Sequence, residues 1–358
     1  MGQLKISVFS KFEMAGGSEF RCVELANGIA KFTAHTSFIL VERKFPDKLR
    51  NHCHPNVRVI EGCLEHPEYF YESDYIIVVN TDVREFSALD YWIGKSSRHA
   101  TKLDIDQLKK KKMFFLYNFL ISPSKNLYQL ANAGMDIQIL TTNKKFFDEI
   151  TKQDRYEQVR DLPRDILVSP IDQTKLRIFT RSPTNGICFG MHSKKVGNKW
   201  NDEIPKLIAD INKRYGGERV KFRFMGIKEE LRNKLEKIKN VICLKEDEES
   251  VKDFLSQLDV FLFFPDWKRE EPWARVIAEA IVSGCPVIAL NRGGTEDQVL
   301  KYNNGFLCKK YGHYYQYMIE LIEHPERISV MSNNSIRISK SFYTENVINK
   351  FLKLINEA

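Results

Sequence analysis

Long hydrophobic runs are missing from this 358-residue sequence. The longest apolar stretches, such as YIIVV and VFLFF, are the size of a buried strand. They fall far short of the roughly 18–20 residues that a membrane-spanning helix needs. The opening residues, MGQLKISVFSKF, also lack the apolar stretch of a secretory signal. We therefore expect a cytoplasmic protein with no transmembrane segment.

Paired cysteines are missing as well. The seven cysteines are an odd number, lie far apart and form no C-x-x-C pair. Disulfide frameworks and structural zinc sites both need such pairs, so neither is expected. We expect reduced thiols that pack as small apolar side chains. The sequence also lacks low-complexity stretches and repeats of about 20–50 residues, which repeat proteins would have.

What is present is ample material for a packed core. Apolar residues make up 43 % of the chain and aromatic residues 12 %. Strand-sized apolar segments alternate with helical patterns from KISVFS (5–10) onward. The pattern breaks around 173–185, a stretch with Pro and Asn, and then a second such series begins. This alternation predicts parallel sheets with helices on both faces.

The sequence therefore predicts an α/β protein of two doubly wound, Rossmann-like domains that face each other across a cleft. The first domain spans residues 1–175 and the second spans residues 176–338. A C-terminal helix over 339–358 follows, and it is a candidate for crossing back to the first domain.

The segment richest in chemical groups is 259–308. An apolar strand, DVFLFF, leads into a polar loop that ends at Glu271, and a helical pattern follows. Pro272 suits the first turn of a helix, because its missing N–H would have no partner there. Eight helical residues advance about 12 Å and turn by about 800°, which is about 80° past two full turns. We therefore expect Glu271 and Glu279 on broadly the same side of one helix.

Two carboxylates at this spacing suit a nucleotide sugar. One can accept hydrogen bonds from hexose hydroxyls and the other from ribose hydroxyls, while the helix N-terminus offers N–H groups to a diphosphate. The alternative is that Glu271 is an ordinary first-turn acid and Glu279 a solvated residue. Against it, Glu279 lies in AEAIVSGCPVIA, an otherwise apolar stretch where an unpaired carboxylate would be costly.

The same block resembles a known family. EPWARVIAEAIVSGCPVIALNRGGTEDQV (271–299) is similar to the Glu-x7-Glu block of GT-B glycosyltransferases, specifically retaining family 4 enzymes, EPFGLVxLEAMAxGxPVIAxxxGGxxE. MAGGSEFRCVELANGIAKF (14–32) is similar to the family's first loop and helix. GMHSKKVGNKW (190–200) stands at the place of a GRxxxxKG segment, although Met191 or His192 replaces the expected Arg.

The resemblance implies a GT-B fold and roles for the matching residues. Glu271 would contact the transferred sugar and Glu279 the ribose. Lys199 would neutralise the departing diphosphate, although a lysine cluster is also typical of a solvated surface. The remaining donor-binding candidates are Gly16, Gly17, His192, Lys194, Pro272 and Trp273.

The implied reaction moves a sugar from a nucleotide-diphosphate sugar, with UDP favoured, to an acceptor hydroxyl with retention of configuration. GT-B enzymes generally use no metal, and no DxD triplet stands in a strand-end loop. We therefore expect a metal-independent enzyme with no cofactor beyond the nucleotide-sugar co-substrate. The alternatives are a nucleotide-sugar-binding module without transfer, and an isomerase or phosphorylase on the same fold.

The acceptor is the least determined partner. Residues 84–125 hold nine Lys and Arg against four acidic residues, and the first domain of GT-B enzymes usually meets the acceptor. Arg98, His99 and Lys102 are therefore candidates for contacting a glycan, a lipid-linked glycan or a hydroxymethylated base in DNA. The alternative is that the lysine run 109–112 is a solvated helix end.

Overall fold

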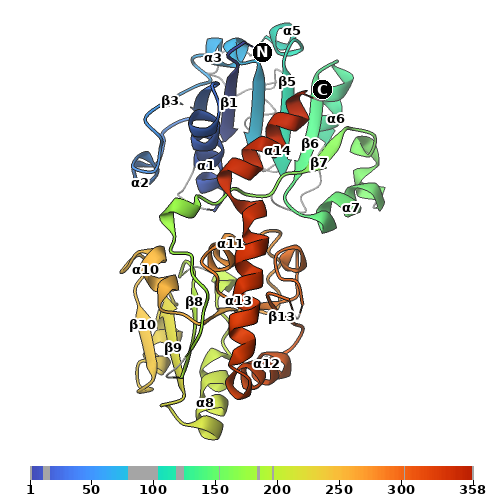
Figure 1. Ribbon diagram of the computed structural model, residues 1–358. Coiled ribbons are helices and arrows are strands. Elements are labelled where there is room, and N and C mark those ends of the chain that lie inside the picture. The colour runs from blue at the N-terminus through green and yellow to red at the C-terminus, as the bar shows by residue number, and fades with distance from the viewer. Residues whose placement is uncertain are drawn as a thin grey trace. The chain divides into compact units, whose positions relative to one another are not determined.

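The computed structural model describes residues 2–10, 17–79, 104–117, 125–152, 154–183, 186–195, 197–301 and 303–356. The chain divides into two compact units (Figure 1). Unit 1 consists of Met1–Pro170 together with Thr344–Ala358, and unit 2 is Ile171–Tyr343. No described helix is long and apolar enough to cross a membrane. The seven cysteines all lie within the described ranges and are free thiols.

Unit 1 is built on a seven-stranded sheet in which every neighbouring pair is parallel. The order is β3-β2-β1-β4-β5-β6-β7. Several of its strands contain continuous apolar runs, such as YIIVV at Tyr75–Val79, because a parallel sheet is buried on both faces. The strands are β1 (Lys5–Ser10), β2 (Thr36–Val41), β3 (Val57–Glu61), β4 (Tyr75–Val79), β5 (Lys112–Tyr117), β6 (Asp136–Thr141) and β7 (Arg164–Ile166).

Helices cover both faces of this sheet, and alternate strand residues divide between two cores. One core includes residues of α1 and α14, and the other includes residues of α3, α5, α6 and α7. The helices are α1 (Gly17–Phe32), α2 (Asp47–Arg50), α3 (Glu68–Glu72), α5 (Ile105–Leu108), α6 (Lys125–Asn132), α7 (Lys144–Lys152), the 3₁₀ helix η2 (Asp154–Val159) and α14 (Thr344–Asn356).

The C-terminal helix α14 completes the core of unit 1, where Figure 1 draws it in red. Gly28 of α1 is the point of close approach, since a Cβ there would lie 2.6 Å from side-chain atoms of both Thr344 and Ile348. Phe351 packs edge-on against Phe114 of β5, with 5.1 Å between ring centroids. The last helix therefore belongs to the same folding unit as the first strands.

Unit 2 is built on a six-stranded parallel sheet of order β10-β9-β8-β11-β12-β13. Its strands are β8 (Ile187–His192), β9 (Val220–Met225), β10 (Val241–Leu244), β11 (Val260–Phe263), β12 (Val287–Leu290) and β13 (Gly305–Cys308). Its helices are η3 (Gln173–Lys175), η4 (Gly197–Lys199), α8 (Ile204–Tyr215), α9 (Glu229–Leu235), α10 (Val251–Ser256), α11 (Arg275–Val282), η5 (Thr295–Asp297), α12 (Tyr311–Glu323), α13 (Glu326–Ser339) and η6 (Lys340–Phe342).

Candidate functional site

The strand order of unit 2 marks where a ligand site is expected. In open α/β sheets, ligands bind beyond the carboxyl ends of the strands, at the point where the strand order reverses. In unit 2 this point lies between β8 and β11, which are neighbours although two strands, β9 and β10, come between them in the sequence. His192 ends β8 and Lys199 follows it, whereas the loop that carries Glu271 follows β11. The predicted residues of this domain therefore gather at one edge of one sheet.

Glu271 and Lys199 contact each other directly, although 72 residues separate them. Lys199 Nζ donates to Glu271 Oε2 at 2.9 Å. Arg269 donates to the same oxygen from Nε at 3.0 Å and from Nη2 at 2.6 Å. Arg269 Nη1 also donates to Asn198 Oδ1 at 2.8 Å, which ties the two loops together. Two cations and one carboxylate leave this cluster with a net positive charge.

Burial strengthens the interaction within this cluster. The side chain of Glu271 is 12 % exposed, that of Arg269 20 % and that of Lys199 26 %. Charges that are partly withdrawn from water are screened less than surface pairs. Each cation keeps enough exposure to reach a ligand at the edge of the sheet. The arrangement can therefore bind an anion and hold a carboxylate in a defined position.

The backbone of Glu271 is held by a close approach to Gly293. The two residues form an isolated parallel bridge, and the N–H of Gly294 donates to the carbonyl of Glu271 at 2.9 Å. Gly293 has a φ of +74°, and a Cβ there would lie 2.3 Å from the Glu271 carbonyl oxygen. Only glycine fits at this position, because it has no Cβ. Gly293 and Gly294 thus hold the loop that carries Glu271 in place.

The helix after this loop starts later than predicted. The prediction that Glu271 and Pro272 open the helix is wrong, because α11 begins at Arg275 and Ala274 is its N-cap in an extended conformation. The side chain of Gln298 holds this start: its Oε1 accepts from the N–H of Ala274 at 2.9 Å, and its Nε2 donates to the Ala274 carbonyl at 3.0 Å. The helical spacing that predicted Glu271 and Glu279 on the same side of one helix therefore does not apply, since only Glu279 lies in the helix.

Glu279 lies within α11 and pairs with a cation on its own helix. Arg275 Nε donates to Glu279 Oε1 at 2.7 Å, one helical turn away. The other oxygen, Oε2, is 3.6 Å from His192 Nε2. The Glu279 side chain is 11 % exposed and the His192 side chain 8 %. Glu279 is therefore a buried, charge-paired group and not a solvated residue of a helix face.

Burial shifts the protonation of both groups. Desolvation, together with the smaller effect of the nearby Arg275 charge, lowers the pKa of His192 to about 4. The ring is packed edge-on against Phe254 and Phe261, each with a centroid distance of 5.6 Å. Desolvation also raises the pKa of Glu279, although Arg275 acts in the opposite direction. His192 is therefore neutral near neutral pH, and its buried Nε2 has no hydrogen-bond partner among the described residues.

The other predicted donor-site residues have mixed surroundings. Lys194 is partly buried, and its carbonyl accepts from Trp200 Nε1 at 3.0 Å. Pro272 is buried. Trp273 is 6 % exposed and packs edge-on against Phe342 inside unit 2. The Trp273 ring is therefore part of the packed core of unit 2.

The remaining predictions concern unit 1. Gly17 opens α1, with open space where a Cβ would stand. Gly16, Arg98, His99 and Lys102 lie outside the described residues. In the lysine run 109–112, Lys109 is exposed just after α5 and pairs with Asp106 at 3.0 Å, whereas Lys112 opens β5.

Two arginines of the site were not predicted from the sequence. Arg269 and Arg275 each neutralise one of the two candidate carboxylates. The Arg275–Glu279 spacing of four residues was a readable signal, because such pairs face each other on a helix. Arg269 gave no comparable signal, since its contact with Asn198 depends on how two distant loops meet. Among the described residues, no group of three or more His, Cys, Asp or Glu side chains is arranged to hold a metal ion.

Comparisons with known proteins agree with this architecture. Residues 180–337 match the family model described as Glycosyl transferases group 1. HepE of Anabaena, crystallised with UDP, has a TM-score of 0.73 and 16 % sequence identity, with 100 % of both chains covered. A HepE complex with UDP-glucose has a TM-score of 0.72 and 14 % sequence identity, with 99 % of this chain and 100 % of that chain covered. A glycosyltransferase from Rickettsia africae has a TM-score of 0.74 and 13 % sequence identity, with 100 % of this chain and 99 % of that chain covered. No curated protein sequence matches the chain.

These likenesses establish the fold. The two parallel-sheet units are the Rossmann-like domains of the GT-B architecture, so the predicted fold class is confirmed. The matched segment 180–337 lies within unit 2, which carries Glu271, Glu279 and Lys199. Unit 2 thus contains the segment that is similar to group 1 glycosyltransferases.

Proposed function

We propose that the protein is a retaining, metal-independent glycosyltransferase that moves a sugar from a UDP-sugar to an acceptor hydroxyl. The observation that carries the proposal is the convergence of Lys199 and Arg269 on Glu271, at the switch point of the segment that is similar to group 1 glycosyltransferases. The HepE structures with UDP and UDP-glucose support UDP as the nucleotide.

Glu271 orients the transferred sugar in this proposal. The bonds from Lys199 and Arg269 all fall on Oε2, and no described donor bonds Oε1. Oε1 is therefore available to accept hydrogen bonds from sugar hydroxyls. Three donors on Oε2 also lower the nucleophilicity of this carboxylate, so Glu271 positions the sugar and does not attack it. Glu279 accepts from the ribose hydroxyls, while Arg275 favours the charged form of its carboxylate.

Lys199 and Arg269 stabilise the departing diphosphate. Glycosyl transfer passes through an oxocarbenium-like state in which negative charge develops on the leaving phosphate. Two fixed cations near that position favour the transition state over the ground state. The first N–H groups of α11 point the positive end of its dipole toward the same edge of the sheet. The chain thus supplies cationic groups of its own for a metal-independent reaction.

The decisive experiment offers UDP-, GDP- and ADP-glucose to the purified chain, with and without EDTA. Acceptors are an oligosaccharide, a lipid-linked glycan and hydroxymethylated DNA, and NMR of the product gives the anomeric configuration. We expect UDP release that survives EDTA, slow donor hydrolysis without acceptor, and an α-linked product from the α-linked donor.

Other outcomes separate the alternatives. Saturable donor binding without hydrolysis or transfer would indicate a binding module. Phosphate-dependent release of glucose 1-phosphate from a glycan would indicate a phosphorylase. An inverted product, or activity abolished by EDTA and restored by Mg²⁺ or Mn²⁺, would contradict the corresponding part of the proposal.

A further inference from the structure

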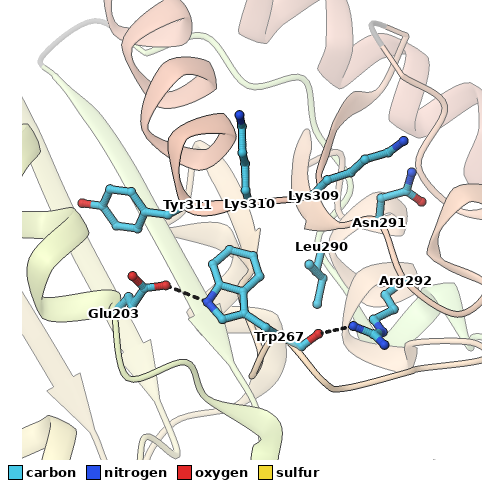
Figure 2. Close-up of a pocket in the computed structure, with 8 residues that line it drawn as sticks. All are labelled: Glu203, Trp267, Leu290, Asn291, Arg292, Lys309, Lys310 and Tyr311. Carbon is cyan, nitrogen blue, oxygen red and sulfur yellow. Dashed lines mark hydrogen bonds between the residues drawn. The ribbon is translucent and has the colours of Figure 1, made fainter.

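Unit 2 contains a second concave site beside the Glu271 loop (Figure 2). Its volume is about 340 Å³, which lies within the range of about 300–1,000 Å³ that is usual for small-molecule sites. The carboxyl ends of β12 and β13, the start of α12 and the loop after β11 form it. The lining residues are Glu203, Trp267, Leu290, Asn291, Arg292, Lys309, Lys310 and Tyr311.

The lining of this pocket is cationic. Lys309, Lys310 and Arg292 are exposed, and among the described residues no carboxylate lies within ion-pair distance of either lysine. The one acidic lining residue, Glu203, already accepts a hydrogen bond from Trp267 Nε1 at 2.6 Å. Like charges gathered around a concavity favour an anionic ligand, because an anion relieves their mutual repulsion.

The pKa of a histidine next to the pocket, His313, is affected by the same positive charges. Burial lowers the pKa of His313, and the charges of Lys310, Lys301 and Lys309 lower it further. His313 Nδ1 accepts from the Lys309 N–H at 3.3 Å, so the imidazole stands beside the pocket rim. The positive potential is therefore a property of the whole α12 entrance and not of one side chain.

Two aromatic rings form rigid walls. The Trp267 indole is held by Glu203 and packs edge-on against Phe264 and Tyr314, with centroid distances of 5.2 and 6.1 Å. The hydroxyl of Tyr311 donates to Asp210 Oδ2 at 2.5 Å. Figure 2 shows the Trp267 ring between Glu203 and Arg292, and the Tyr311 ring on the same side as Glu203. Rings that are already fixed lose little conformational entropy when a ligand packs against them.

The pocket and the Glu271 cluster use different sides of one loop. Trp267 and Arg292 line the pocket, and Arg292 Nη1 donates to the Trp267 carbonyl at 2.7 Å. Arg269 and Glu271 instead contact Asn198 and Lys199. Arg292 also pairs with Glu270, the neighbour of Glu271, at 3.3 Å. A ligand in the pocket would therefore bind next to the Glu271 cluster without using its residues.

We propose that this pocket binds a small phosphate ester. Lys309, Lys310 and Arg292 hold the phosphate, because several cations together suit a doubly charged group better than a single carboxylate. Trp267 and Tyr311 pack against the organic part. This inference does not depend on glycosyl transfer, since it rests on the charges and walls of the pocket alone.

The test is titration calorimetry of the full chain with glucose 6-phosphate and phenyl phosphate, with inorganic phosphate and glucose for comparison. The pocket variant is Lys309→Ala/Lys310→Ala, whose side chains are exposed and whose removal leaves the core intact. The matched control is Lys234→Ala/Lys237→Ala, which removes the same charge from exposed positions near α9.

We expect at least one ester to bind the wild type more tightly than inorganic phosphate and glucose. Its affinity should fall at least tenfold in the pocket variant and stay unchanged in the control. The tryptophan fluorescence that changes on binding should be lost in Trp267→Phe. Binding of neither ester, equal affinity for inorganic phosphate, or equal affinity in the pocket and control variants would each overturn the proposal.

Discussion

At the scale of single residues, the site is a set of charges held in pairs. Glu271 shares one oxygen between Lys199 and Arg269, and Glu279 is paired with Arg275. A partly buried carboxylate that keeps one of two cations remains paired, whereas one that loses its only cation is left with an uncompensated charge. The two carboxylates should therefore respond differently to substitution of their partners.

Substituting Lys199 should reduce catalysis more than stability. In Lys199→Ala, Arg269 still neutralises Glu271, so the melting temperature should change little. If Lys199 stabilises the leaving diphosphate, kcat should fall about 100-fold or more, as when one transition-state donor is removed elsewhere. Kinetics and thermal unfolding check this, with the exposed Lys268→Ala as the charge-matched control. Equal rates for the two variants would remove Lys199 from the reaction.

Substituting Glu279 should weaken nucleotide binding. Glu279→Gln keeps the shape of the side chain but loses the charge that strengthens a hydrogen bond from a ribose hydroxyl. We expect the Kd for UDP to rise about tenfold, equivalent to about 1.4 kcal/mol. Calorimetry compares this variant with Glu296→Gln, an exposed acid of the same block. Unchanged affinity in Glu279→Gln would contradict the ribose role.

His192 should titrate far below an ordinary histidine. Its pKa is about 4 in the fold, whereas an unfolded chain takes up the proton near pH 6.5. The unfolded state therefore binds more protons in this window, so the contribution of His192 to stability falls as pH falls from about 6.5 to 4. The loss is about 3 kcal/mol at most. NMR titration checks the midpoint, using the imidazole resonance absent from His192→Gln; a midpoint near 6.5 would contradict burial of the ring.

At the scale of elements, contacts distant in sequence decide where α11 begins. Pro272 on its own favours a helix start, yet the bridge to Gly293 and the clamp by Gln298 keep residues 271–274 out of the helix. The composition of the strands was readable because both faces of a parallel sheet are apolar. The start of α11 could not be predicted from the local sequence, because the residues that determine it, Gly293 and Gln298, lie further along the chain.

Removing the Gln298 clamp should destabilise unit 2. In Gln298→Ala, the buried N–H of Ala274 loses its partner, whereas the Ala274 carbonyl still accepts from the N–H groups of Ile277 and Ala278. An unsatisfied buried N–H costs about 1–3 kcal/mol, so we expect a loss of about that size in the free energy of unfolding. Gln298→Glu should cost at least as much, because it keeps the acceptor but replaces the donor with a buried carboxylate oxygen that faces the Ala274 carbonyl oxygen. Denaturant unfolding checks this against the exposed Gln257→Ala, for which little change is expected.

At the scale of the whole molecule, sequence patterns predicted the class of both sheets but not all of their detail. Strand segments such as YIIVV and VFLFF are observed as β4 and β11. By contrast, β7 at Arg164–Ile166 is a short polar segment, and it pairs only with β6 at the sheet edge. The Glu-x7-Glu block located the site, but the pairing of Glu271 with Lys199 depends on which strands become neighbours. That choice is made by tertiary packing.

Deleting α14 should unfold unit 1 selectively. Val347, Ile348, Phe351 and Ile355 are buried against the core of unit 1. Each buried side chain of this size contributes about 1.5–3 kcal/mol, and the sum is comparable to the total stability of a domain. A chain that ends at Tyr343 should therefore lose amide protection in unit 1 and retain it in unit 2. Hydrogen exchange with mass spectrometry checks this; uniform protection loss, or none, would contradict the division into units.

The position of α14 also has a consequence for biosynthesis. A ribosome releases the C-terminal residues last, and domains generally fold as units while the chain is being made. Ile171–Tyr343 is then complete as soon as it leaves the exit tunnel, whereas the earlier-made sheet must wait for residues 344–356 to cover its apolar face. Unit 2, most of which is synthesised after unit 1, can therefore complete its folding first. Nascent chains stalled before Thr344 should present the first half as a client for chaperones.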